Sequence, residues 1–355
     1  MTGQLVLAVK QKARQLGFTL AGIALPEPPA HLDVYLGWLK AGRQAGMAYL
    51  ADQRAVERRA DPSLILPECR SILVLGTPYS KPQPGQPQTE ASPRGRVAAY
   101  AWGADYHLVL PERLRALVSF LEERVGHAIP NRCYTDTGPI LERELAMRAG
   151  LGWIGKNTCL INPQQGSTFL LSEIFLGLDL PPDEPFRADQ CGSCTRCIKA
   201  CPTQCIRADR TLEAGRCISY LTIENKLEIP LELRPLTGDW VFGCDICQIV
   251  CPWNQRFASP KGDPVFEARP GLPNPELASD LALMPQEFNR KFRDSPLQRA
   301  KRRGYLRNIA IAGGNSRETG LLPALQAAQE DAEPLVSEAA RWAMSRLGDD
   351  GFIPV

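Results

Sequence analysis

Apolar positions alternate between helical and strand-like spacing over the first 180 residues of this 355-residue chain. The first helix is expected to bury one apolar face, formed by Leu5, Val9, Ala13 and Leu16. Further helices are predicted at 31–59 and 112–125, and short strands at 18–23 and 71–75. Residues 80–96 are rich in Pro, Gly and Gln, which indicates a mobile surface loop. The pattern predicts an α+β or α/β domain over residues 1–180.

Another helix is predicted from 139 to 149, because Pro139 suits a first helical turn, where its missing N–H would lack a partner anyway. Asp136 then lies at or just before the helix N-terminus. A carboxylate there is usually a cap, and the helix dipole lowers its pKa. Catalysis is the alternative role for this carboxylate. The glycine-rich stretch 150–155 that follows forms a loop able to approach a cofactor closely.

From about residue 263 the pattern changes to helices separated by turns. One helix opens at Ser295-Pro296, and two more are predicted at 319–329 and 333–347 with the spacing of a helix-pair repeat. Between residues 290 and 307 eight basic residues stand against one acidic residue, a local net charge of +7 in a chain of net charge +2. A charge run is most often a solvated helix face, but this dense, arginine-rich run favours phosphate binding.

Length and composition change this picture in two ways. A chain of 355 residues is long for one core, so two or three domains are expected. The N-terminus lacks the pattern of an export signal, and no apolar stretch approaches the roughly 20 residues that span a bilayer. We therefore expect a soluble cytoplasmic protein with no membrane partner.

The twelve cysteines are clustered, which indicates ligands in a reducing compartment and not disulfides. Between 191 and 202 they form C-x2-C-x2-C-x3-C-P, the bacterial ferredoxin spacing, in which the fourth cysteine binds the other cluster. We predict one [4Fe–4S] cluster on Cys191, Cys194, Cys197 and Cys251, and a second on Cys201, Cys217, Cys244 and Cys247. Zinc is the alternative metal. Cys205 is either a packed thiol or a replacement for Cys201 or Cys217.

Four segments resemble the epoxyqueuosine reductase family, in the order expected for it. They are YTDTGPILERELAMRAGLGWIGKNT (134–158), CGSCTRCIKACPT (191–203), RCISYLTIENK (216–226) and FGCDICQIVCPWN (242–254); LRNIAIAGGN (306–315) is similar to the start of the family's HEAT-like helices. The resemblance implies a nitroreductase-like, cobalamin-binding α/β domain at 1–180, a ferredoxin-like domain with two [4Fe–4S] clusters at 181–262, and a HEAT-like, tRNA-binding helical domain at 263–355.

The resemblance also implies an activity: removal of the epoxide oxygen of epoxyqueuosine at the wobble position of tRNA, the last step of queuosine synthesis. Electrons would pass from an external low-potential donor through the clusters to base-off cobalamin in a monomeric enzyme. Asp136 is the implied proton donor, a role that requires burial to raise its pKa. Corrinoid contacts are implied at Arg59, Asp136, Lys156, Asn157, Leu160, Ser172, Ser219 and Asp245. Contacts with tRNA are expected at Glu224, Lys226, Arg299, Arg302, Arg303 and Arg307.

Two departures limit the transfer of roles. The tripeptide Asp105-Tyr106-His107 begins like a D-x-H-x-x-G cobalamin motif, but Leu110 stands where glycine is required. The stretch Val97 to Trp102 lacks the cysteine that some members of the family have near cobalt. Two other functions stay open: a corrinoid reductive dehalogenase of small organohalides, and a ferredoxin-like electron carrier. The absence of an export signal and the basic tail both disfavour the dehalogenase.

Overall fold

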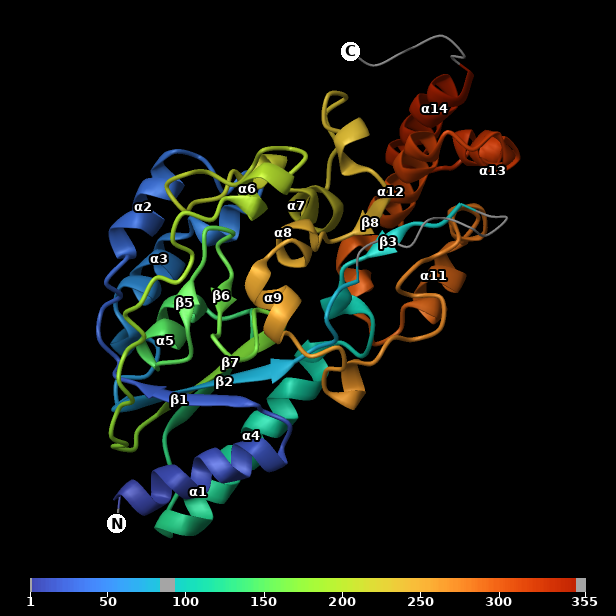
Figure 1. Cartoon of the computed structure of the whole chain (residues 1–355). Coiled ribbons are helices and arrows are strands. Elements are labelled where there is room, and N and C mark those ends of the chain that lie inside the picture. The colour runs from blue at the N-terminus through green and yellow to red at the C-terminus, as the bar shows by residue number, and fades with distance from the viewer. Residues whose placement is uncertain (1, 84–92, 349–355) are drawn as a thin grey trace.

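The structure is a computed structural model that describes residues 2–83 and 93–348. Most of the surface loop predicted at 80–96 lies outside these residues. A mixed arrangement of helices and strands is confirmed (Figure 1). No helix in the described ranges is both long and apolar enough to cross a bilayer.

A four-stranded antiparallel sheet with the order β1-β2-β7-β4 forms the centre of the N-terminal part. Its strands are β1 (Leu20–Ala24), β2 (Ser71–Pro78), β7 (Phe169–Leu176) and β4 (Asn131–Tyr134). One face is covered by α1 (Thr2–Gln15) and α4 (Tyr106–Val125), the other by α5 (Glu142–Arg148) (Figure 1). Because side chains alternate along a strand, Leu73 and Leu75 of β2 join the α1–α4 core, whereas Ile72 and Val74 join the α5 core.

Short helices carry the cysteine-rich segment above the sheet. They are α6 (Arg196–Ala200), α7 (Ile218–Ile223), α8 (Ile246–Ile249) and α9 (Pro252–Phe257). The small hairpin of β5 (Trp153–Ile154) and β6 (Leu160–Ile161) lies between these helices and the sheet (Figure 1). Helix α6 packs against α8, which brings the two cysteine motifs together although about 50 residues separate them.

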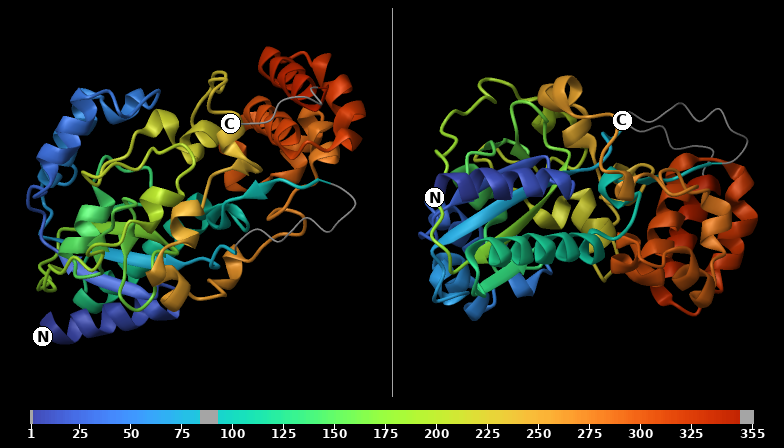
Figure 2. Two further views of the ribbon diagram at one scale, coloured as in Figure 1. Left: turned by 45° about the horizontal axis from the view of Figure 1, so that its top comes forward. Right: turned by 90° about the horizontal axis from the view of Figure 1, so that it is seen from below.

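The C-terminal helices gather at one end of the molecule (Figure 2). They are α10 (Leu277–Leu281), α11 (Pro285–Lys291), α12 (Lys301–Ser316), α13 (Leu322–Gln329) and α14 (Pro334–Gly348). Helix α12 is the core helix of this group, because every residue from Gly304 to Gly314 is buried. Their core also contains Val97 and Ala101, and β3 (Arg96–Val97) pairs in parallel with β8 (Trp240–Phe242). Segments far apart in sequence thus share one core.

Local predictions succeed where the helix is regular and fail at its ends. The first helix buries Val9 and Ala13 as expected. Residues 31–59 form α2 (Leu32–Lys40) and α3 (Gln53–Ala60) with an irregular connection between them. Helix α4 begins at Tyr106, six residues earlier than predicted, because the side chain of Asp105 accepts the backbone N–H of His107 and caps it.

Candidate functional site

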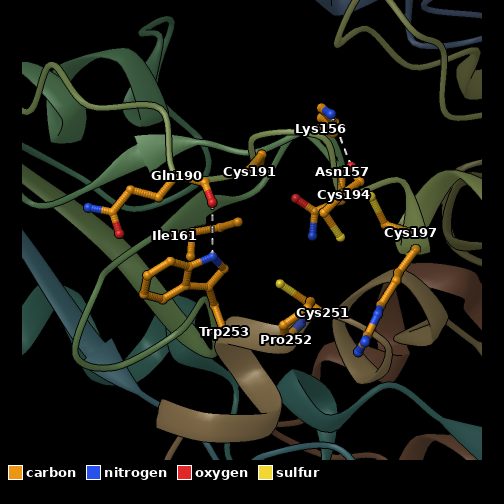
Figure 3. A pocket seen from close by; sticks show the side chains of 11 residues that line it. Lys156, Asn157, Ile161, Gln190, Cys191, Cys194, Cys197, Cys251, Pro252 and Trp253 are labelled. Atoms are coloured by element: carbon orange, nitrogen blue, oxygen red, sulfur yellow. Dashed lines mark hydrogen bonds between the residues drawn. The ribbon is translucent and has the colours of Figure 1, made fainter.

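The first predicted group of four cysteines lines one pocket (Figure 3). Its thiols belong to Cys191, Cys194, Cys197 and Cys251. Trp153 Nε1 donates to Cys191 Sγ at 3.4 Å, and Lys156 Nζ donates to the carbonyls of Gly192 and Cys194 at 2.6 and 3.0 Å. The indole and the ammonium therefore fix the loop that carries these thiols.

The second predicted group is assembled from the ends of three helices. Cys201 ends α6, Cys217 precedes α7, and Cys244 and Cys247 lie just before and within α8. Burial raises the pKa of Cys244, and the negative charges of Cys217 and Cys201 raise it further, so these thiols lie within electrostatic range of each other. Cys205 is buried beside them, with its Sγ 3.4 Å from that of Cys201.

The donors present fit iron–sulfur clusters, because soft thiolates in two groups of four are the ligands that such clusters use. Within the ranges that the structure describes, no three His, Cys, Asp or Glu side chains converge closely enough for a single metal ion. A four-iron cube holds its thiolates further apart than a single ion does, and the sulfur-lined pocket of the first group leaves room for one (Figure 3).

Asp136 lies in a loop between β4 and α5 and does not cap the helix, so the predicted capping role is wrong. Helix α5 begins at Glu142, three residues after Pro139, and the residue before it is Leu141. Asp136 has a left-handed backbone, with φ of +60°, and its N–H donates to Glu142 Oε1 at 2.6 Å. This contact holds the loop in a conformation that is uncommon for residues other than glycine.

The carboxylate of Asp136 instead faces helix α4. Tyr106 donates its hydroxyl to Asp136 Oδ2 at 2.8 Å, and His107 Nε2 lies 3.5 Å from the same oxygen. The other ring nitrogen of His107 lies 2.9 Å from Asp105 Oδ1. The Asp136 side chain keeps 62% of its surface accessible, so the end of this chain of contacts is open to a substrate.

The pKa values of His107 and Asp136 are shifted in opposite directions. Hydrogen bonds to Asp105 and Asp136 raise the pKa of His107 to about 9. Although the Asp136 side chain is accessible, surrounding protein displaces water and would raise its pKa; the hydrogen bonds from His107 and Tyr106 outweigh this effect and hold the pKa below its usual value. At neutral pH the proton of this pair therefore resides on the imidazole and the carboxylate is ionised.

Two further carboxyl groups lie behind Asp136. Glu173 on β7 is fully buried, and burial together with the neighbouring Glu142 raises its pKa well above the usual range. Burial also raises the pKa of Glu142 to about 7, and the charge of Asp136 adds to that shift. Because like charges repel, Glu173 holds its proton at neutral pH.

The residues expected to contact a corrinoid divide into two sets. Ser172 on β7 and Asn157 are buried, and Ser172 Oγ, Asn157 Nδ2 and the nearby Thr77 Oγ1 have no hydrogen-bond partner among the described residues. Buried polar atoms without partners are rare in folded proteins, which is consistent with a missing polar ligand. Asp245 Oδ2 accepts the N–H of Ala99 at 2.7 Å, and burial raises the pKa of Asp245 to about 6.

The second set consists of Lys156, Arg59, Leu160 and Ser219. Lys156 Nζ donates to carbonyls of the first cysteine group, and its contact with a corrinoid stays a prediction. The guanidinium of Arg59 is buried and donates to the Ala55 carbonyl. Leu160 is buried in β6, and Ser219 is half-buried in α7.

The basic run does not form a continuous RNA-binding face. Arg307 is 1% exposed, and its guanidinium donates to the backbone carbonyls of Leu221, Asn225 and Leu227, so its predicted contact with tRNA is wrong. Tyr305, an aromatic residue within the basic run, is fully buried as well. Both residues belong to the core helix α12.

Arg302 is also engaged within the protein. It pairs with both carboxylate oxygens of Asp331, at 3.2 and 2.5 Å, and donates to the Leu283 carbonyl at 2.7 Å. Its side chain is 16% exposed and forms an internal ion pair, and its contact with tRNA stays a prediction. Arg303, one position further along α12, is exposed.

Three of the residues expected to contact tRNA form an exposed group at the junction of α7 and α12. Arg299, 58% exposed, donates to both carboxylate oxygens of Glu224 at 2.8 and 2.9 Å. Lys226 Nζ donates to the Arg299 carbonyl at 3.1 Å. The charge of Arg299 also lowers the pKa of Asp136, so this group lies within electrostatic range of the Asp136 carboxylate.

Sequence reasoning noted Tyr106 and His107 only as part of an incomplete cobalamin motif, and it missed Glu142 and Glu173 as residues of the site. A signal was present for His107, because it is one of only three histidines and follows Asp105 at the start of a helix. Glu142 and Glu173 carried no such signal, since their proximity arises from β7 and α5 packing together.

Comparison with known proteins places these features in a family. Residues 190–254 match the 4Fe–4S double cluster binding domain, and residues 59–137 match the family described as epoxyqueuosine reductase QueG, DUF1730. The chain is 41% identical to epoxyqueuosine reductase of Pseudomonas aeruginosa, over 98% of this chain and 95% of that protein. It is 40% identical to the enzyme of Xanthomonas campestris over 96% of this chain and 95% of that protein.

Solved structures agree with this match. A crystal structure of epoxyqueuosine reductase with an epoxyqueuosine-modified tRNA-Tyr stem loop superimposes with a TM-score of 0.91 at 31% identity, covering 98% of this chain and 92% of that one. Epoxyqueuosine reductase from Bacillus subtilis, with its catalytic aspartate loop swung out of the active site, gives 0.89 at 31% identity over the same shares. The extent and identity of these matches show that the chain belongs to the epoxyqueuosine reductase family.

Proposed function

We propose that the protein reduces epoxyqueuosine to queuosine at the wobble position of tRNA. The eight motif cysteines would hold two [4Fe–4S] clusters, which together with cobalamin would supply electrons from an external low-potential donor. The observation that carries this proposal is the 41% identity to an epoxyqueuosine reductase over 98% of the chain, in a fold whose eight motif cysteines gather in two groups.

Asp136 delivers a proton to the departing oxygen in this proposal. Its carboxylate is accessible, and it is the end of a hydrogen-bonded chain that includes Tyr106 and His107. Cobalamin, when bound, supplies the reduced metal centre that delivers electrons to the substrate. The protein's own task is to hold the substrate oxygen at Asp136 and to protonate it, because an unprotonated oxide is a poor leaving group.

Ser172, Asn157 and Asp245 are the residues best suited to hold the corrinoid. The first two have buried polar atoms without partners, and Asp245 joins the Ala99 backbone to the second cysteine group. Leu160 and Ser219 add apolar and polar surface nearby in this assignment. We assign the nitroreductase-like cobalamin domain to 1–180, the ferredoxin-like domain to 181–262 and the HEAT-like domain to 263–355.

The tRNA is proposed to bind where the exposed group of Glu224, Lys226 and Arg299 lies, with Arg303 as a further phosphate contact. A relative has been solved with a modified tRNA stem loop, which supports a stem loop as the ligand. The modified base must leave the stack to reach Asp136, as bases do in other enzymes that act on them. The accessible Asp136 carboxylate meets that requirement.

The activity is tested with anaerobically purified protein, reconstituted with iron, sulfide and cobalamin and supplied with a low-potential reductant. Nucleoside mass analysis of epoxyqueuosine-modified tRNA should show loss of one oxygen. The Asp136→Asn variant should keep its iron, its corrinoid and its tRNA affinity but lose turnover, whereas Asp179→Asn, at an exposed surface position, should match the wild type. No loss of oxygen with the wild-type protein would refute the proposed activity, and near-normal turnover of Asp136→Asn would refute the role of its carboxyl.

A further inference from the structure

The proposed reaction needs two protons in each turnover. Two C–O bonds of the epoxide break, a C=C bond forms, two electrons from the external donor are consumed, and the oxygen takes two protons to leave as water. One carboxyl group can give only one of them. Asp136 must therefore be loaded with a proton twice in each turnover.

We propose that His107 supplies both protons to Asp136 in turn, through the contact between His107 Nε2 and Asp136 Oδ2, and that its partly exposed ring regains a proton from water after each transfer. This inference rests on the proposed function and adds a residue to it. His107 acts through Asp136 and does not touch the substrate. Asp105, on the other side of the ring, completes a line of acid, imidazole and acid.

The geometry directs the imidazole at Asp136. Asp105 Oδ1 accepts the backbone N–H of His107 at 3.0 Å and also lies 2.9 Å from Nδ1 of the same residue. The ring therefore cannot turn without breaking the helix cap. The N–H of Asp105 donates to the Asp294 carbonyl at 2.9 Å, which anchors the cap itself. With Nδ1 engaged, Nε2 is the nitrogen left to face Asp136, 3.5 Å away. Tyr106 steadies the same carboxylate oxygen from one side.

The charges around the pair keep the proton on the ring at rest. Asp105 and Asp136 face His107 directly, and both raise its pKa. Arg269 acts on Asp105, and Arg299 acts on Asp136 from the C-terminal part, each lowering the pKa of the carboxyl that it faces. The charge of Asp136 also acts on Tyr106, Tyr100, Tyr49, Glu142 and Glu173. The pair thus starts as imidazolium and carboxylate, and moving the proton onto Asp136 makes the carboxyl a competent acid.

The test is the pH dependence of a single turnover of the reduced holoenzyme on an epoxyqueuosine-modified stem loop. The wild-type rate constant should fall as the pH rises through about 9, where the imidazolium loses its proton. His107→Gln keeps a side chain able to hydrogen bond but unable to carry the proton. It should lower the rate about 100-fold and remove the fall near pH 9. The matched control, His127→Gln, changes an exposed histidine and should leave both unchanged.

Chemical rescue separates proton storage from a structural role. Added imidazole should restore part of the rate to His107→Ala in proportion to its protonated fraction, while iron content, corrinoid content and stem-loop affinity stay at wild-type values. A His107→Gln rate within twofold of wild type, an unchanged fall near pH 9, or a loss of corrinoid or RNA binding would each overturn the proposal. Failure of the wild-type protein to turn over would instead count against the proposed function.

Discussion

Replacing Arg307 with Met should unfold the C-terminal part of the protein far more readily while leaving RNA binding almost unchanged. Methionine fills a similar volume but donates no hydrogen bond. Its introduction would leave the buried carbonyl of Leu221 and the partly buried carbonyls of Asn225 and Leu227 without this donor. An unsatisfied buried polar group costs about 1–3 kcal/mol. One buried and two partly buried carbonyls, partly offset by no longer burying a charge, predict a loss of about 2–4 kcal/mol in the free energy of unfolding.

The matched control is Arg303→Met, one turn earlier on the same helix at an exposed position. It should change the free energy of unfolding by less than about 0.5 kcal/mol. It should also flatten the dependence of tRNA affinity on salt by about one phosphate contact. Urea denaturation followed by circular dichroism and binding of a labelled stem loop at several salt concentrations measure the two effects. A stable Arg307→Met protein with a flattened salt dependence would refute the assignment of Arg307 to the core.

Three further predictions follow from single contacts. Burial raises the pKa of Glu142 from 4.5 to about 7, so the contribution of this carboxyl to stability is present below pH 4.5 and is lost as the pH rises through 7. Glu142→Gln should therefore raise the melting temperature at pH 8.5 but not at pH 4.5. Equal effects at the two pH values would contradict this prediction. Gly314→Ala places a Cβ 2.8 Å from a Cα of α14 and should lower the free energy of unfolding, measured by urea denaturation, by about 1–3 kcal/mol. The control Gly313→Ala should cost less, because the nearest neighbour of its Cβ is the end of a leucine side chain at 3.3 Å. Cys194→Ser should lower the iron content from about eight to about four per chain, whereas Cys69→Ser should not change it.

The parts of the site that sequence could predict are those whose geometry is local. Cysteines separated by only two intervening residues must lie on one loop. The spacing of Cys191, Cys194 and Cys197 therefore indicates their common pocket before any fold is known. The apolar face of the first helix is similarly local, since it depends only on a repeat of 3.6 residues.

The parts that sequence could not predict depend on which atoms meet across the fold. Arg307 looks like part of a charged surface, because nothing in the run of basic residues reveals the carbonyls of Leu221 and Leu227 about 80 positions away. In the sequence Asp136 looks like a helix cap, because Pro139 suits a first helical turn. In the structure Asp136 has a left-handed backbone, and the helix begins only at Glu142. Its true partner, His107, stands on a helix that precedes it by one strand.

The pairing of β3 with β8 has a consequence for biogenesis. A growing polypeptide releases residues 96–101 long before residues 240–242 and the helices that enclose them have been synthesised. Until then Val97 and Ala101 are without their final neighbours, and the sulfur pocket still lacks Cys251. The sulfur pocket therefore stays incomplete until residue 251 of 355 has been synthesised, and a ribosome that stalls before Cys251 yields a fragment unable to complete either that pocket or the C-terminal core.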